Sequence, residues 1–261
     1  MGNRRNGSRI QGERGVTRSS WQRADVANMF LDERRAAIPY GVDQVQIAVR
    51  AIHHFGVRPT RFIDLGCGDG YLARVILSHF PHAEAILIDH SPAMLQRARA
   101  AMQPYRAVRI IEGDLADSLL TWVEPESVEL VIAGYSIHHL PHERKRSLYE
   151  EIFTVLKPGG MFLNIEHVAS ASPEIERLWD DVFIDLIAER TGKPREEAAH
   201  EYHTRPDKQD NILLPVDVQV RWLREIGFAH ADCLFRFLEL AVFGGVKPRG
   251  RGYPNSREAR S

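Results

Sequence analysis

The stretch "FIDLGCGDG", residues 62–70, constrains the fold more than any other, because three glycines stand at every second position directly after a short apolar run. Gly66 comes where the chain must turn sharply, Gly68 lacks a side chain where a ligand could lie on the backbone, and Gly70 lets a following helix pack closely. This pattern is typical of a nucleotide-type ligand loop between a strand and a helix. The alternative is an ordinary strand-to-helix turn that uses glycine for positive φ.

Short apolar runs alternate with stretches of helical periodicity through residues 61–167. Continuous apolar strands alternating with helices imply an α/β fold with a parallel sheet covered on both faces. Ser91 before Pro92 is typical of an N-cap, and "LKPGG" places proline and glycines just past a helix that ends near Leu156. The expected strands are 61–66, 85–89, 108–114, 128–135 and 160–167, with helices over 71–80, 92–102 and 143–156.

The segments before and after this alternation complete the predicted domain. Two N-terminal helices are expected over 21–38 and 41–55, separated by Pro39. Residues 169–215 interrupt the alternation of strands and helices with further helical segments, which we interpret as an insertion after the fifth strand. A helix that ends at Gly227 and two closing strands then return to the pattern. We therefore predict a single domain over 21–247, with a disordered arm at 1–20 and a disordered tail at 248–261.

Charge is unevenly distributed along the chain. Residues 1–23 carry six Arg against Glu13, and residues 247–261 carry five Lys or Arg against Glu258, so a chain of net charge -1 has a middle of about -10. An acidic body argues against a polyanion lying across the main surface, although basic arms can still touch nucleic acid or anionic lipid. The charge pattern thus disfavours nucleic acid as a partner.

Cysteine usage and hydropathy point to the cytoplasm. Cys67 and Cys233 form neither a disulfide framework nor a metal-ligand spacing, so both are expected to be free thiols. The longest apolar runs fall far short of the ~20 residues that a membrane helix needs, and the first residues carry no signal-peptide pattern. We expect a cytoplasmic protein that does not associate with a membrane.

Acidic residues end two of the predicted strands at the edge that carries the glycine loop. Asp89 ends the second strand, where a carboxylate can accept hydrogen bonds from both hydroxyls of a ribose; otherwise it is an N-cap. Asp114 after the third strand is a candidate acceptor for an exocyclic amine, with Leu115 against a flat base, although a lone Asp there is usually a turn residue. Tyr71 replaces the last glycine of a dinucleotide fingerprint, which counts against NAD.

These motifs together resemble the class I S-adenosylmethionine-dependent methyltransferases. The resemblance rests on D-x-G-x-G-x-G at 64–70, the acid ending the second strand, "GD" at 113–114, "IHHL" at 137–140 and "LKPGG", and it covers residues 40–168 and 215–247. It implies a Rossmann-like, doubly wound, seven-stranded and mostly parallel sheet with an antiparallel last strand, and S-adenosyl-L-methionine as the cofactor.

The resemblance also implies a set of cofactor-binding residues. The loop would hold the methionine part, Asp89 the ribose, and Asp114 with Leu115 the adenine, while the segment from Ala133 to Ser136 would line the methyl-donor channel. Tyr40 belongs to a segment that in many relatives closes over the cofactor. The full set is Asp64, Gly66, Cys67, Gly68, Gly70, Asp89, His90, Met94, Asp114, Leu115, Gly134, Tyr135 and Tyr40.

Candidate catalytic groups follow the fourth and fifth strands. An amine or hydroxyl acceptor needs help to lose its proton, and histidine is the usual base near neutral pH. His139, Glu166 and His167 lie where open α/β sheets place their ligands and are the candidate catalytic residues, with His138 beside them. Their alternative is structural, because "HHL" recurs in relatives with different substrates. No metal is expected, since His138, His139 and His142, and likewise His200 and His203, lack a cysteine or carboxylate partner at a metal-ligand spacing.

The insertion over residues 169–215 is expected to border the binding site of the methyl acceptor. Trp179, Phe183, Tyr202 and His203 are interpreted either as core or as an acceptor pocket. The stretch "HTRPDKQDNILLP" is either an exposed loop or a mobile lid whose Arg205, Asp207 or Lys208 meets a polar substrate.

Four functions are compatible with these residues. The leading hypothesis is methyl transfer to a small-molecule acceptor, because the insertion could enclose a modest acceptor and the acidic body disfavours nucleic acid. The alternatives are an RNA or protein methyltransferase, a dinucleotide-dependent oxidoreductase, and a non-catalytic partner that keeps the loop as a scaffold.

Overall fold

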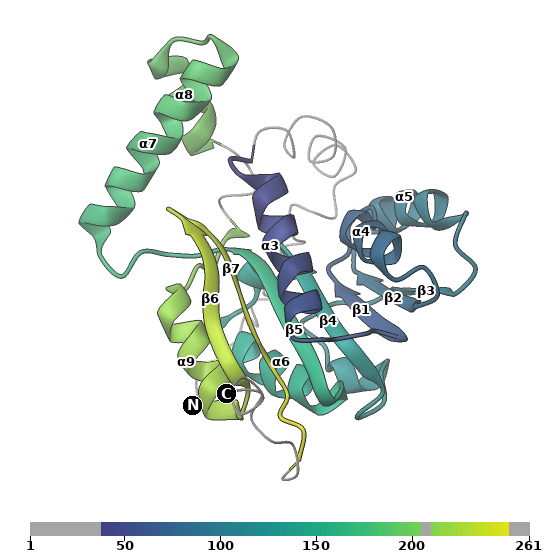
Figure 1. Cartoon of the computed structure of the whole chain (residues 1–261). Coiled ribbons are helices and arrows are strands. Elements are labelled where there is room, and N and C mark those ends of the chain that lie inside the picture. Colours follow the sequence, from purple (N-terminus) through teal and green to yellow (C-terminus); the bar gives the residue numbers. More distant parts are fainter. Residues whose placement is uncertain (1–37, 205–209, 251–261) are drawn as a thin grey trace, which may run out of the picture.

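The computed structural model describes residues 38–204 and 210–250 of the 261-residue chain. Its centre is a seven-stranded sheet in the order β3-β2-β1-β4-β5-β7-β6 (Figure 1). Strands β1 to β5 are parallel, whereas β7 is antiparallel to both of its neighbours, β5 and β6. The predicted sheet and its antiparallel last strand are confirmed. The strands are β1 Arg61–Leu65, β2 Glu84–Asp89, β3 Val108–Glu112, β4 Val128–Gly134, β5 Leu156–His167, β6 Ala229–Phe237 and β7 Leu240–Val246.

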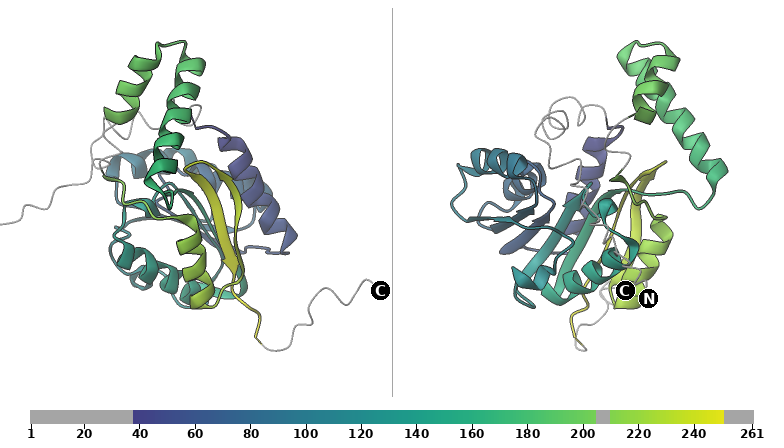
Figure 2. Two further views of the ribbon diagram at one scale, coloured as in Figure 1. Left: turned by 90° about the vertical axis from the view of Figure 1, so that its left-hand side faces the viewer. Right: turned by 180° about the vertical axis from the view of Figure 1, so that it is seen from behind.

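Helices cover both faces of the sheet (Figures 1 and 2). Successive strand residues point to opposite faces: Phe62 and Leu130 belong to the core under α3, α4 and α5, whereas Ile63 and Val131 belong to the core under α6 and α9. The covering helix changes sides between β1 and β4, which is the switch point where open α/β sheets bind ligands. The helices are α3 Gly41–His54, α4 Tyr71–His79, α5 Pro92–Met102, α6 His142–Val155, α7 Pro173–Thr191, α8 Arg195–Thr204 and α9 Val216–Ile226, with short 3-10 turns η2 Leu119–Thr121 and η3 Ile137–His139.

The ends of the predicted domain are only partly described. Helix α3 confirms the second expected N-terminal helix. The first one, over 21–38, lies almost wholly outside the described residues, as do the predicted arm and most of the predicted tail. No helix within the described ranges is both long and apolar enough to cross a membrane.

Strand β5 begins earlier than the sequence pattern predicts. The expected start was Gly160, after a "KPGG" turn, but the strand starts at Leu156, directly after α6. Leu156 pairs with Val128 and Met161 with Leu130, so the residues between them form an irregularity in the strand. Gly159 has φ +85°, and a Cβ on Gly160 would lie 2.9 Å from the carbonyl oxygen of Lys157. The glycines therefore shape a bulge within the strand instead of a loop before it.

The insertion after β5 contains α7 and α8, which extend away from the sheet (Figure 2). Phe183, Ile184 and Tyr202 form a small separate core with Leu240 at the start of β7, and Trp179 is also buried, at 7% exposure. These aromatic side chains thus serve as core. The two ends of the insertion meet, because Ala169 and Pro215 form an isolated parallel bridge.

Candidate active site

The glycine loop, residues 66–70, joins β1 to α4 with a left-handed backbone at all three glycines. The φ angles are +62° at Gly66, +54° at Gly68 and +80° at Gly70, a region that residues with side chains rarely adopt. Buried Asp64 at the end of β1 accepts a 3.0 Å hydrogen bond from the backbone N–H of Ala73 in the first turn of α4. Strand, loop and helix are therefore held in one fixed arrangement.

The three glycines meet different surroundings. A Cβ on Gly66 would lie 2.2 Å from Cβ of Ser136, and one on Gly70 would lie 2.7 Å from Cε of Met102. A Cβ on Gly68 would have no described atom within 4 Å. Gly66 is thus required for close packing, whereas the methyl group of Met102 near Gly70 ends a flexible side chain and the backbone at Gly68 is open to a ligand, which fits the predicted role of this loop.

Replacing Gly66 by alanine is expected to lower the free energy of unfolding by about 2–4 kcal/mol, because left-handed strain adds to an overlap with Ser136 that the packed strands cannot relieve. Urea denaturation followed by circular dichroism measures the loss. Gly56→Ala is the matched control, because Gly56 has φ +65° but open space around its Cβ position; it should cost only the strain, about 1–2 kcal/mol. Equal losses in the two variants would contradict the packing argument.

Asp89 connects the glycine loop to β2. Its Oδ2 accepts a hydrogen bond from the backbone N–H of Gly68 and its Oδ1 accepts one from that of Ser91, both at 2.8 Å. Burial raises the pKa of Asp89, and these backbone bonds oppose that shift. A carboxylate has about four acceptor positions, so the ribose hydroxyls of an adenosyl ligand fit beside the two backbone donors.

Residues 90–94 lead from β2 into α5. Oγ of Ser91 accepts a 3.4 Å hydrogen bond from the backbone N–H of Met94, so Ser91 and not Asp89 is the N-cap of α5. Met94 is buried, at 4% exposure. Nε2 of His90 is buried without a hydrogen-bond partner among the described residues. A buried polar atom of this kind is costly unless it is paired, which fits a ligand beside Asp89.

Cys67 within the loop is buried, at 6% exposure. Burial, and then the neighbouring charge of Asp89, raise the pKa of its thiol well above the ordinary value. The thiol is therefore protonated at neutral pH, and Cys67 contributes packing and its backbone instead of a nucleophile.

Asp114 and Leu115 follow β3 in a loop that α6 fixes. Oδ1 of Asp114 accepts a 2.9 Å hydrogen bond from the backbone N–H of Ala116, so Asp114 forms the turn that was its alternative interpretation, and its second oxygen lies at an exposed position. Leu115 belongs to the core under α6 and is only 8% exposed. Arg144 of α6 donates to the carbonyl oxygens of Leu115 at 2.8 Å and Asp117 at 2.6 Å, which sets the position of this loop.

The end of β4 faces the N-terminal part of α3. Tyr135 has φ +52°, and its backbone N–H donates to the carbonyl of Ile165 at 2.8 Å. Its hydroxyl lies 2.5 Å from Oε1 of Gln44, a fully buried residue of α3. Burial raises the pKa of Tyr135 far above its ordinary value, so this hydroxyl is a fixed hydrogen-bond donor and not a proton acceptor.

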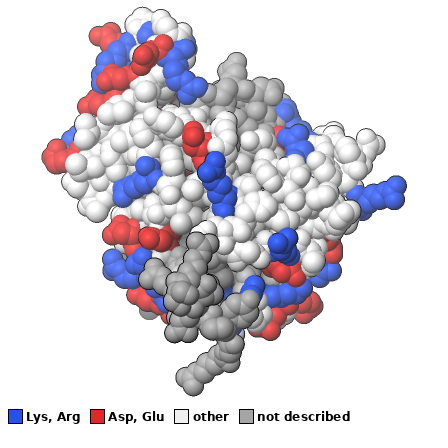
Figure 3. Space-filling model, viewed as in Figure 1, with Lys and Arg blue, Asp and Glu red and all other residues white. Residues whose placement is uncertain are grey.

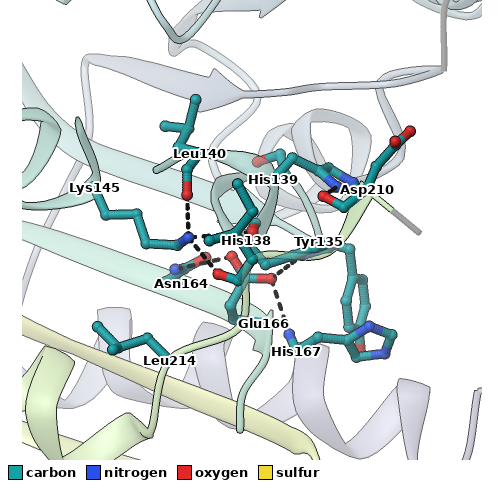
Figure 4. A network of polar contacts seen from close by, with 12 residues as sticks. Tyr135, His138, His139, Leu140, Lys145, Asn164, Glu166, His167, Asp210 and Leu214 are labelled. Carbon is teal, nitrogen blue, oxygen red and sulfur yellow. Dashed lines mark hydrogen bonds and ion pairs between the residues drawn. The ribbon is translucent and has the colours of Figure 1, made fainter. Parts of the chain in front are cut away.

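A buried polar network lies at the carboxyl ends of β4 and β5 (Figure 4). Nδ1 of His138 lies 2.5 Å from Oε1 of Glu166, and the backbone N–H of His167 donates to the same oxygen at 2.9 Å. Asn164 donates to the other oxygen, Oε2, at 3.4 Å. Glu166 is 1% exposed, and burial raises its pKa to about 7. This carboxyl group therefore exchanges a proton near neutral pH.

His139 differs from its neighbour. Its Nδ1 lies 3.1 Å from the carbonyl oxygen of Asp210, so Nδ1 must carry the proton in this contact. Burial, and then the proximity of His138, lower the pKa of His139 to about 3. A group with this pKa is a weak proton acceptor at neutral pH. His138, in contrast, is directed at the carboxyl group of Glu166.

His167 lies between two other rings. Its ring centroid is 5.0 Å from that of Tyr135 and 5.4 Å from that of His138. His167 is half-buried, so a substrate could contact it. Of the three predicted catalytic residues, Glu166 and His167 therefore lie together with His138, and His139 adjoins them.

Other predicted residues lie elsewhere. Tyr40 is 52% exposed and packs against Phe237 of β6 at 4.7 Å between ring centroids; Gln44, one turn later, is the residue that reaches Tyr135. Arg205, Asp207 and Lys208, the candidate lid residues, lie outside the described residues. No group of three His, Cys, Asp or Glu side chains in the described part of the chain is arranged to hold a metal ion.

Three buried polar residues at this edge were missed by sequence reasoning. They are Gln44, Lys145 and Asn164. A signal existed for two of them: Asn164 interrupts an apolar strand, and Lys145 precedes Leu148, Tyr149 and Ile152 at the spacing of the core-facing side of α6. Gln44 lies in a mixed helix and offers no such signal.

Comparison with known proteins agrees with this arrangement. A family model described as a methyltransferase domain matches residues 62–160, from β1 into β5. Two similar curated proteins are carboxy-S-adenosyl-L-methionine synthases. The one from Nautilia profundicola is 22% identical and covers 85% of this chain and 92% of its own length. The one from Wolinella succinogenes is 28% identical and covers 84% and 89%.

A solved structure shares the fold. A chain in the complex between the Haloferax volcanii Trm112 methyltransferase activator and a methyltransferase superposes with a TM-score of 0.59 at 19% identity, over 87% of this chain and 99% of that one. The methyltransferase model covers the same strands and loops that position Gly68, Asp89 and the end of β4, so this chain carries a methyltransferase domain and is similar to the class I S-adenosylmethionine-dependent methyltransferases.

Proposed function

We propose that this enzyme transfers a methyl group from S-adenosylmethionine to a small-molecule acceptor bound above the carboxyl ends of β4 and β5. The observation that carries the proposal is the buried Glu166–His138 pair, which lies at those strand ends and has a protonatable carboxyl group with a pKa of about 7. Open α/β sheets bind their ligands at this edge.

The cofactor half of the site would use backbone and carboxylate groups. Gly68 would face the methionine part, Asp89 would accept hydrogen bonds from the ribose, and Nε2 of His90 would pair with a ligand atom. Asp114 and Leu115 would lie beside the adenine, positioned by Arg144. The bound cofactor supplies an electrophilic methyl group; the protein's part is to align an acceptor with it, which can contribute about 7–11 kcal/mol.

The acceptor half would remove a proton. With its Nδ1 directed at Oε1 of Glu166, His138 is held in one orientation. The pair can take up one proton from an amine or hydroxyl acceptor as that group attacks, with His167 and Tyr135 bordering the same space. General-base assistance of this kind contributes about 10²- to 10⁴-fold in rate.

A small acceptor is favoured over RNA by the surroundings of the site. The insertion packs an apolar core of Phe183, Ile184 and Tyr202 beside Tyr135. On the described part of the face in Figure 3, basic and acidic side chains are interspersed instead of forming one basic surface. Phosphate backbones are bound by concentrated Lys and Arg, so these features favour a small molecule over RNA as the acceptor.

A second candidate follows from the curated relatives. Proteins named carboxy-S-adenosyl-L-methionine synthase align over 84–85% of this chain. In that case S-adenosylmethionine would be modified instead of giving its methyl group to an acceptor.

One experiment separates the candidates. The protein is incubated with S-adenosylmethionine and, in turn, panels of amines, phenols, thiols and carboxylic acids, or total RNA, and the adenosyl products are measured by mass spectrometry. S-adenosylhomocysteine formed only with a small molecule supports the proposal, formation only with RNA contradicts it, and carboxy-S-adenosylmethionine establishes the second candidate. If the folded protein binds neither S-adenosylmethionine nor S-adenosylhomocysteine in calorimetry, both proposals fail.

A further inference from the structure

Lys145 of α6 is an unusual buried cation. It is 1% exposed, yet within the described residues no carboxylate lies at salt-bridge distance from its ammonium; its partners are three backbone carbonyls. Nζ donates to the carbonyl oxygens of His138 at 3.1 Å, Ile212 at 2.6 Å and Leu140. An ammonium has three N–H donors, so the arrangement satisfies all of them.

The three carbonyls belong to two segments that are far apart in the sequence. His138 and Leu140 belong to the turn η3 and its C-cap. Ile212 belongs to residues 210–214, here named the return segment, which leads from the insertion back to α9. Lys145 thus joins the turn that carries the candidate base to the segment that closes the insertion (Figure 4).

Two further hydrogen bonds join the same segments. The backbone N–H of Ile212 donates to the carbonyl of His138 at 3.0 Å, and Nδ1 of His139 donates to that of Asp210 at 3.1 Å. The carbonyl of His138 therefore accepts from both Lys145 and Ile212. Without the ammonium, the carbonyl oxygens that accept from Lys145 would lose this hydrogen-bond donor. The loss is costly because water cannot replace the donor in a buried environment.

We propose that Lys145 is a positioning residue, which fixes η3 against the return segment and so holds His138 in the orientation that it needs toward Glu166. The inference rests on the proposed function, since it assigns Lys145 to the acceptor side of that site. The end of the insertion and the turn η3 are then held together. The position of His138 relative to the acceptor depends on Lys145, which touches neither substrate nor cofactor.

The inference is tested first by hydrogen exchange with mass spectrometry on the full chain, which needs no acceptor. Lys145→Met keeps an unbranched side chain that is one heavy atom shorter, and it removes the three N–H donors. Peptides that cover residues 138–140 and 210–214 should exchange about 10- to 100-fold faster than in the natural protein. Affinity for S-adenosylhomocysteine, measured by calorimetry, should change less than about twofold, because the loops at Gly68 and Asp89 are untouched.

Ile152→Val and Ile152→Ala are the controls, because Ile152 is fully buried on the same helix and has no polar group. They remove one and three buried carbons, which destabilises the core by increasing amounts, and should not accelerate exchange selectively in the two segments. Unchanged exchange in Lys145→Met, or the same selective acceleration in the Ile152 variants, overturns the inference. Where Lys145→Met does not fold, Lys145→Gln, which retains two donors, is compared in the same way and should give intermediate protection.

The kinetic readout follows once an acceptor is identified. Lys145→Met should lower kcat at least about tenfold without changing KM for S-adenosylmethionine, and Lys145→Gln should recover part of the loss. A change in the KM for S-adenosylmethionine alone contradicts a role in positioning His138. Absence of S-adenosylhomocysteine binding by the natural protein would instead overturn the proposed function, and the exchange comparison still decides the role of Lys145.

Discussion

Replacing Asp89 by alanine is expected to weaken the binding of S-adenosylhomocysteine by about 10²- to 10⁴-fold. Each charged hydrogen bond to a ribose hydroxyl contributes about 1.5–3 kcal/mol, and a factor of ten corresponds to about 1.4 kcal/mol. The variant also leaves the N–H groups of Gly68 and Ser91 without the carboxylate that now accepts their 2.8 Å hydrogen bonds. Isothermal titration calorimetry measures the affinity directly.

The matched variants for this measurement separate binding from structure. Asp89→Asn keeps one acceptor oxygen and a similar shape, so it should lose less affinity than Asp89→Ala. Asp114→Ala removes a carboxylate from an exposed turn and should cost about tenfold or less. Thermal unfolding confirms that each variant is folded. An affinity of folded Asp89→Ala within about threefold of the natural protein would show that Asp89 has no role in ribose binding.

Replacing Glu166 by glutamine is expected to lower kcat by about 10²- to 10⁴-fold, the range of general-base catalysis. Burial raises the pKa of Glu166 to about 7, and a base must be deprotonated to act. In the natural enzyme kcat should therefore be low in acid and rise with pH to a plateau above about pH 7. Glutamine does not titrate, so the variant should lack this limb and show a low, flat profile.

The measurement is kcat against pH with the acceptor found in the product screen, at saturating S-adenosylmethionine. Glu239→Gln is the control, because Glu239 is another buried carboxylate, at 5% exposure, but lies between β6 and β7. In Glu239→Gln, the rise of kcat near pH 7 should persist. If Glu166→Gln retains both the value of kcat and its rise near pH 7, the base is another group or the acceptor needs no base.

The order of the elements was accessible from sequence because it depends on local patterns. Apolar runs of strand length that alternate with amphipathic stretches predict a doubly wound sheet wherever they occur. Glycine at 66, 68 and 70 was also readable, because left-handed φ angles are a local requirement of the backbone. Asp64 and Asp89 were readable as residues at strand ends, since parallel strands bring their carboxyl ends to one edge.

Several side chains took positions that no local pattern specifies. Leu115 packs into the core under α6, because Arg144 holds the backbone of its loop from a helix 29 positions away. The "KPGG" stretch became a bulge within β5, because the pairing with β4 continues across it. Sequence reasoning preferred His139 to His138, since nothing in "HHL" shows which ring is directed at Glu166.

The sequence by itself determined the sheet, its glycine loop and the residues at its carboxyl edge, because these follow from backbone conformation and periodic burial within short segments. Tertiary structure alone decided which polar groups pair there: His138 with Glu166, 28 positions apart, Lys145 with Ile212, 67 apart, and Gln44 with Tyr135, 91 apart. The physical reason is that burial forces each of these groups to find a partner, and the partner that it meets depends on strand order and on the packing of distant segments.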